Sequence, residues 1–94
     1  VRTTALSDWA MAETMAELAR RGPSFEGFPE RSVAGGTITS TVRAIGEWEV
    51  EVVVVGRRDD WQSTITGRVS LLTGPRILWW QRTQGPQDVD NSGP

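Results

Sequence analysis

Carboxylates are the only side chains of this chain that could carry proton-transfer chemistry. Cys, His and Tyr are absent, and all 10 basic residues are Arg. Thiol and lysine nucleophiles, imidazole bases and Tyr acids are therefore excluded, as are the commonest ligands of transition metals. Glu47, Glu49 and Glu51 stand at alternate positions, and in a β-strand this spacing places all three side chains on one face.

The pattern around these glutamates favours a structural role over a catalytic one. In the strand pairing predicted below, Glu49 lies between Arg43 and Arg68, and a carboxylate held by two guanidinium groups is a poor proton acceptor. We therefore expect no catalytic residue, no metal ion and no cofactor. The alternative is a small-molecule-binding protein or a small enzyme that uses Glu49 or Glu51 in a pocket on the sheet face.

The glutamates belong to the segment that predicts the central strand of a sheet. Within residues 47–55, Val50 and Val52 alternate with the glutamates. Val53 and Val55 then place apolar groups on the face that the glutamates occupy. A strand that is apolar on both faces needs a cover on both faces, so we expect a helix on one side and another chain on the other.

Residues 5–21 predict the helix, and the sequence Gly22-Pro23 ends it. Its apolar residues recur at helical spacing. The predicted buried stripe consists of Trp9, Ala12, Ala16 and Ala19, with Met11, Met15 and Leu18 alongside. Because most of these side chains are small, we expect the helix to lie close against a sheet.

The rest of the chain predicts an antiparallel sheet. Residues 24–34 are interpreted as a crossover loop pinned by two Phe side chains. Alternating residues then predict four strands, at 36–44, 47–55, 61–72 and 76–82. The predicted fold is a single α+β domain at residues 1–83, with one N-terminal helix packed on a four-stranded antiparallel β-meander. A disordered C-terminal tail is predicted at residues 84–94.

Matching of like faces sets the predicted strand register. It places Val42 opposite Val50, Glu49 opposite Arg68, and Arg68 opposite Trp80. The inner face, which the helix covers, then carries a predicted core of Ile38, Val42, Trp48, Val50, Val52, Val54, Trp61, Ile65, Val69, Leu71, Ile77 and Trp79.

The opposite, outer face is predicted to be the functional surface, because it combines a charge ladder with apolar groups that a monomer would leave in water. The predicted partner-binding residues are Arg43, Glu49, Glu51, Val53, Val55, Arg68, Leu78 and Trp80. We interpret the chain as a small non-enzymatic protein-interaction or regulatory module. It is expected to act through the outer face or edge of its sheet, most simply as a homodimer.

Charge and composition restrict the other classes of partner. Trp80 could stack on a base while nearby arginines hold phosphates, but a net charge of −2 and a pI of about 5.0 argue against nucleic acid. No apolar run approaches the length of a membrane span. We expect a cytoplasmic protein with a protein partner.

Overall fold

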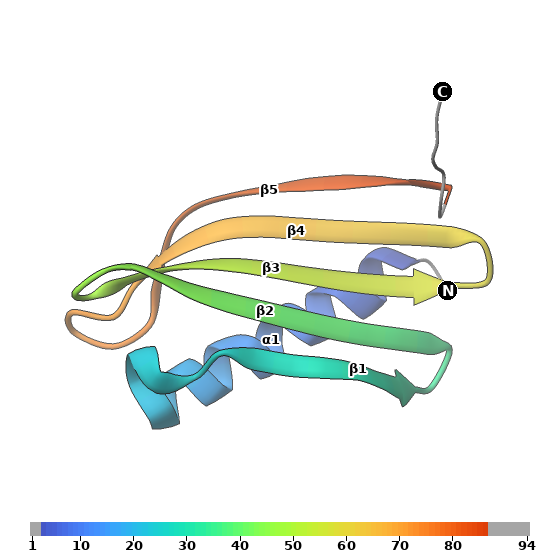
Figure 1. Ribbon diagram of the computed structural model, residues 1–94. Coiled ribbons are helices and arrows are strands. Elements are labelled where there is room, and N and C mark those ends of the chain that lie inside the picture. Colours follow the sequence, from blue (N-terminus) through green and yellow to red (C-terminus); the bar gives the residue numbers. More distant parts are fainter. Residues whose placement is uncertain (1–2, 87–94) are drawn as a thin grey trace.

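The computed structural model describes residues 3–86, which form one helix and one five-stranded antiparallel sheet (Figure 1). The chain begins with α1 (Thr3–Arg21) and a short 3₁₀ turn, η1 (Gly22–Ser24). The strands are β1 (Gly27–Val33), β2 (Gly36–Gly46), β3 (Glu49–Arg58), β4 (Trp61–Ser70) and β5 (Arg76–Pro86). The predicted α+β class with an N-terminal helix and an antiparallel sheet is confirmed.

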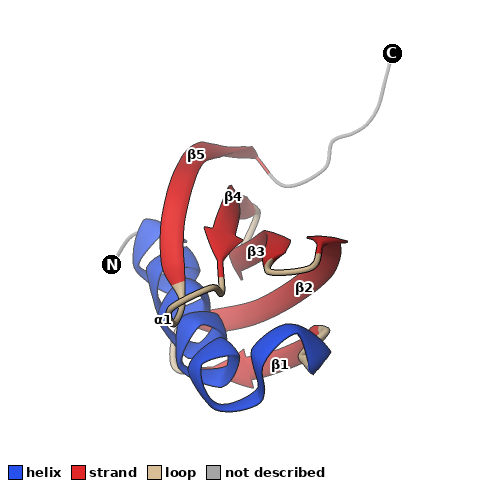
Figure 2. Ribbon diagram, turned by 90° about the vertical axis from the view of Figure 1, so that its left-hand side faces the viewer, coloured by secondary structure: helices blue, strands red, loops and turns tan. Residues whose placement is uncertain are grey.

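The sheet is a simple meander in which each strand pairs with the next along the chain, so that β1 and β5 form its two edges. The helix α1 lies across one face and packs against β2, β3 and β4. Figure 2 shows that the sheet curls around α1, with β5 at one end of the curve and β1 at the other.

The strand β1 is the one that the sequence reasoning missed, since residues 24–34 were predicted to be a loop. It pairs with β2, and the register shifts between Phe28 and Arg31. That irregularity, together with Pro29, removes the alternating pattern by which a strand is recognised. A proline fits here because β1 is an edge strand, where a missing N–H group costs no sheet hydrogen bond.

The predicted buried stripe of α1 is confirmed for Met11 and Leu18 only. The buried residues are Leu6, Ser7, Ala10, Met11, Thr14 and Leu18. Trp9, Ala12, Ala16 and Ala19 are exposed instead. The buried set has helical spacing too, but it contains two hydroxyl groups that the search for apolar residues passed over.

Those two hydroxyl groups set the position of α1 on the sheet. Ser7 Oγ lies 2.9 Å from Ser63 Oγ of β4, and Thr14 Oγ1 lies 2.7 Å from Ser40 Oγ of β2. Gly56 of β3 lets the helix come close, because a Cβ atom built there would lie 2.6 Å from the Cβ atom of Leu6. Thr14 Oγ1 also donates to the Ala10 carbonyl oxygen within the helix. Because a shift of α1 would break the contacts with Ser63 and Ser40, these buried hydroxyl pairs favour one helix position.

Two of the predicted strand registers are wrong by two residues. Val42 lies opposite Val52, and Arg68 lies opposite Glu51. For β3 and β4 the cause is hairpin length, because only two residues join them, with Asp59 at a positive φ of 55°, as two-residue hairpins require. For β2 and β3 the turn lies at Glu47 and Trp48, which were predicted to begin the central strand, and the register shifts between Ala44 and Gly46. A slip of two residues keeps every side chain on its predicted face.

The pairing of β4 with β5 changes faces, because its register shifts between Arg68 and Val69. Val69 lies opposite Ile77, whereas Arg68 lies opposite Trp79 and Gly67 lies opposite Trp80. The predicted placement of Trp80 beside Arg68 is therefore wrong. The strand β5 also continues to Pro86, past residue 83, where the domain was predicted to end. Residues 87–94 of the predicted tail lie outside the described residues.

The core lies between α1 and the middle of the sheet. Its buried apolar residues are Leu6, Ala10, Met11, Leu18, Phe25, Ile38, Val42, Val50, Val52, Val54, Ile65, Val69 and Leu71. Four residues of the predicted core, Trp48, Trp61, Ile77 and Trp79, are instead exposed. Trp48 lies in the turn between β2 and β3, Trp61 is the first residue of β4, and Trp79 lies opposite Arg68 on the outer face. On the helix side, a helix about 10–12 Å wide cannot cover five strands spaced about 4.8 Å apart, so Ile77 of the edge strand β5 stays exposed.

Candidate functional site

The charged residues of the predicted outer face form two separate ion pairs. Arg43 Nη2 lies 2.6 Å from Glu51 Oε1, and Arg68 Nε lies 3.2 Å from Glu49 Oε2. All four side chains are partly exposed, and exposed ion pairs of this kind contribute only about 0–1 kcal/mol each. Both glutamates therefore have an arginine partner on an open surface, which is no setting for a general base.

The valines of the outer face are half-buried by their neighbours on the same face. Val53 lies between Thr41 of β2 and Thr66 of β4. Val55 is flanked in the same way, by Thr39 and Thr64. The threonine side chains shield much of the apolar area that the sequence predicted to be exposed.

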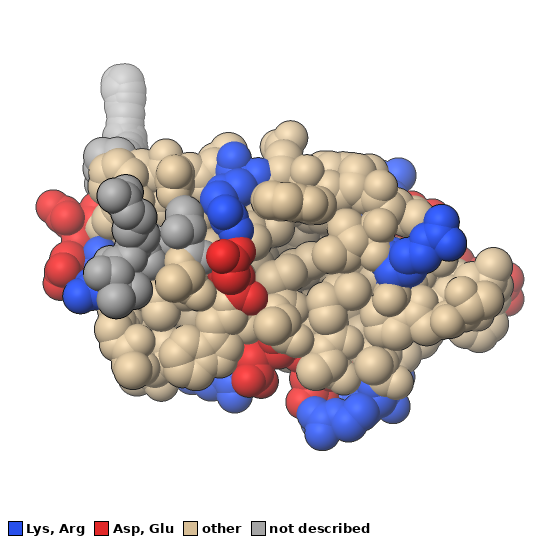
Figure 3. Space-filling view, turned by 180° about the vertical axis from the view of Figure 1, so that it is seen from behind, with Lys and Arg blue, Asp and Glu red and all other residues tan. Residues whose placement is uncertain are grey.

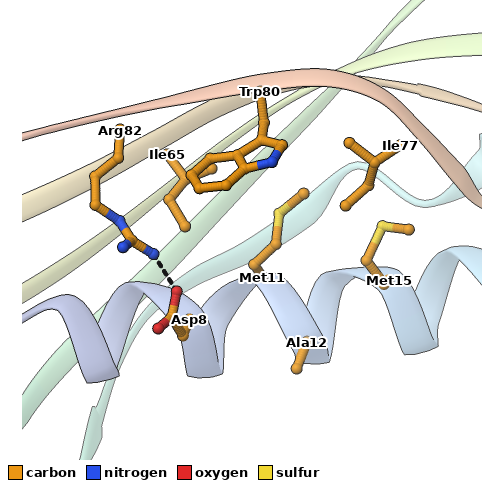
Figure 4. A pocket seen from close by; sticks show the side chains of 8 residues that line it. All are labelled: Asp8, Met11, Ala12, Met15, Ile65, Ile77, Trp80 and Arg82. Carbon is orange, nitrogen blue, oxygen red and sulfur yellow. Dashed lines mark hydrogen bonds and ion pairs between the residues drawn. The ribbon is translucent and has the colours of Figure 1, made fainter.

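The two remaining predicted site residues belong to β5, and the structure separates them. Leu78 is the extra residue of the bulge and has no opposite residue in β4. Trp80 turns to the helix side, where it faces Met11 and Met15 of α1 (Figure 4). Trp79 takes the outer-face place opposite Arg68 that was predicted for Trp80.

Four of the exposed apolar side chains follow one another on β5. Ile77 is 40% exposed, Leu78 45%, Trp79 43% and Trp80 50%. The sequence did contain a signal for this surface, because four consecutive apolar residues cannot all lie on one face of a strand. The sequence reasoning missed Ile77 and Trp79 by assigning both to the core.

The two edges of the sheet differ in how they are protected. The edge strand β1 has Pro29, the charged residues Glu30 and Arg31, and an irregular register, all of which discourage a further strand. In β5, by contrast, the only charged residues are Arg76 and Arg82, and the register against β4 is regular from Trp79 to Pro86. The backbone groups that β5 turns away from β4 form an open hydrogen-bonding edge, with no strand beyond it among the described residues (Figure 1).

A groove separates β5 from α1 on the helix side of the sheet. Its volume is about 370 Å³, within the range of about 300–1,000 Å³ that is usual for small-molecule sites. The lining residues are Asp8, Met11, Ala12, Met15, Ile65, Ile77, Trp80 and Arg82. The helix side of the molecule is hollowed near its middle, and mainly uncharged residues surround the hollow (Figure 3).

The groove has a charged end and an apolar end. At the charged end, Arg82 forms an ion pair with Asp8 and lies over the Trp80 ring, with the guanidinium carbon 5.5 Å from the ring centroid. The Trp80 ring extends over Met11, and Ile77 lies farther along the groove beside Met15 (Figure 4). A molecule that fills the groove would meet charge at one end only.

A second cavity of about 220 Å³ lies at the other side of β4 and β5 and is lined by Gln62, Thr64, Thr83, Gln84 and Gly85. Neither Glu49 nor Glu51 lines either of these two cavities. Within residues 3–86, no group of three or more carboxylates is arranged to hold a metal ion. The same residues include no helix of the length and apolarity that crossing a membrane requires.

Comparison with known proteins adds no further assignment. The chain matches no model of a protein family, no curated protein and no solved structure at a significant level.

Proposed function

We propose that this domain is a non-enzymatic protein-interaction module that associates through the open edge of β5, most simply as a homodimer. The observation that supports this proposal is an 11-residue edge strand that carries four consecutive exposed apolar residues, Ile77 to Trp80. An edge of this length and apolarity is a template for another strand. Main-chain hydrogen bonds would hold such a strand, and side chains on both faces would select it.

A second copy of the chain is the partner that β5 fits best. In an antiparallel pairing centred on Gln81, Trp80 of each copy lies opposite Arg82 of the other, and the two Gln81 side chains lie opposite each other. Because β5 contains no acidic residue and its two arginines do not meet in this register, no like charges face each other. An arginine beside an aromatic ring is favourable, and the pairing is symmetric, as a two-fold dimer requires.

Charge placed at Gln81 tests both the dimer and its register. Gln81 is exposed on the outer face opposite Thr66, so Gln81→Glu and Gln81→Lys should leave the monomer fold intact. In the dimer each variant sets like charges directly opposite each other, which should weaken association by up to about fivefold. An equimolar mixture of the two variants should associate at least as well as the wild-type chain, because opposite charges then meet.

The measurement is sedimentation equilibrium over a range of protein concentrations, with far-ultraviolet circular dichroism to confirm that the fold is unchanged. Thr83→Glu is the matched control, since Thr83 is on the same face of β5 but lies opposite Trp79 of the second copy. A wild-type chain that stays monomeric at every concentration refutes the homodimer. A dimer that responds equally to charge at Gln81 and at Thr83 refutes the β5 register.

A further inference from the structure

We propose that the groove between α1 and β5 binds a small amphipathic anion, with an apolar body along Met11, Met15 and Trp80 and a carboxylate on Arg82. This inference does not require the homodimer, although Trp80 and Arg82 line the groove and also meet across the proposed pairing. Pairing along the β5 edge lies in the plane of the sheet, whereas the groove opens on the helix side. Gln81, the residue that tests the dimer, does not line the groove.

The apolar length of the groove follows from the incomplete cover that one helix provides. Ile65 and Met11 form its floor as members of the core, while Trp80 and Ile77 reach over it from β5. Methionine side chains adapt to the shape of an occupant, and sulfur atoms make favourable contacts with aromatic rings. An unbranched chain or a flat ring that lies between Met15 and Trp80 would remove this apolar surface from water.

The charged end favours an anion over a cation because Arg82 is more deeply buried than Asp8, its partner in the ion pair. The Arg82 side chain is 26% exposed, whereas the Asp8 side chain is 61% exposed. The Nε atom of Arg82 is also buried without a hydrogen-bond acceptor within residues 3–86, and a buried donor without an acceptor is costly. Asp8 can therefore turn into water at little cost, and a ligand carboxylate can take its place on the guanidinium group.

The methionine side chains can serve as a spectroscopic probe of this site, because the chain has two methionines and both line the groove. With methionine labelled by ¹³C at the methyl group, nuclear magnetic resonance follows Met11 and Met15 directly. The ligands are decanoate, decan-1-ol and decyltrimethylammonium, which share a ten-carbon chain. The two ions are added below their micelle concentrations and decan-1-ol below its solubility limit. Decanoate should shift both methyl signals in a saturable way, and it should bind up to about fivefold more tightly than decan-1-ol, the ratio that an ion pair of about 1 kcal/mol gives.

Two pairs of comparisons locate the body and the head of the ligand. Ala12→Phe fills the groove from the helix and should abolish the methyl shifts, whereas Ala16→Phe, at an exposed position one turn farther along α1 that does not line the groove, should not. Arg82→Gln should remove the preference for decanoate over decan-1-ol while binding of both persists.

Any of three results would overturn the proposal. The first is the absence of a saturable methyl shift with decanoate. The second is equal or tighter binding of decyltrimethylammonium, which would assign the charged end to Asp8. The third is a variant result that places the ligand outside the groove, either an unchanged decanoate preference in Arg82→Gln or an equal loss of binding in Ala12→Phe and Ala16→Phe.

Discussion

Replacing Gly56 by Ala should push α1 away from β3 and destabilise the domain. A Cβ atom at this position would lie 2.6 Å from both the Leu6 Cβ atom and the Ser7 backbone nitrogen. Carbon atoms prefer separations of about 3.5–4.0 Å, so the helix must move by about 1 Å. Neither contact is to the far end of a flexible side chain that could turn aside.

Three contributions determine the change in the free energy of unfolding, two of them destabilising and one stabilising. Overpacking of this kind costs about 1–3 kcal/mol. A 1 Å shift of Ser7 would also lengthen its 2.9 Å contact with Ser63 beyond hydrogen-bond distance, and a buried hydrogen bond contributes about 1 kcal/mol. Ala is intrinsically more favourable than Gly in a strand, and this difference offsets about 0.5–1 kcal/mol of the loss. We therefore expect a net loss of about 1–3.5 kcal/mol, which lowers the midpoint of thermal unfolding by about 4–28 °C in a domain of this size.

Thermal and urea unfolding followed by circular dichroism measure this loss. All variants should be compared at one protein concentration, because association raises apparent stability. Gly46→Ala is the matched control, since a Cβ atom there would lie 3.8 Å from the Glu49 Cβ atom, an ordinary contact. If Gly56→Ala and Gly46→Ala unfold at the same temperature, the close approach of α1 to β3 is not a feature of this protein.

Two further predictions concern the same core. Val52→Asp should unfold the domain because Val52 is fully buried and an unpaired buried charge is very costly, whereas Val53→Asp on the outer face of the same strand should remain folded. Circular dichroism separates the two variants, and a folded Val52→Asp would show that the helix side of β3 is not the core. Thr14→Ala and Ser40→Ala should give a coupling energy of about 1 kcal/mol in a double-mutant cycle of unfolding free energies, because the two hydroxyl oxygens lie 2.7 Å apart in the core. Strict additivity of the two losses would mean that this contact does not stabilise the fold.

Periodicity along the chain was enough to predict the class of the fold and the faces of the central strands. Val50, Val52 and Val54 were assigned to the core, and all three are buried. The two wrong registers did not change this assignment. The direction of side chains repeats every two residues along a strand, so an error of two residues preserves the face. The charged residues of the outer face were also assigned to the correct face for this reason.

The candidate site on β5 depended on tertiary structure. One extra residue at the bulge exchanged the faces of Trp79 and Trp80, and the sequence contains no sign of where that residue is inserted. The strand β5 was already an edge of the predicted meander, and the structure adds that the other edge is β1 rather than β2.

The sequence by itself determined that the chain alternates as an antiparallel sheet after one helix, and that its chemistry is limited to carboxylates and arginines. The tertiary structure decided which face of α1 is buried, because Ser7 and Thr14 become core residues only when Ser63 and Ser40 are there to accept or donate a hydrogen bond. It also decided that a groove is left beside Trp80. Local periodicity specifies which face of the sheet a residue occupies. The width of one helix relative to five strands specifies which part of the helix-side face remains uncovered.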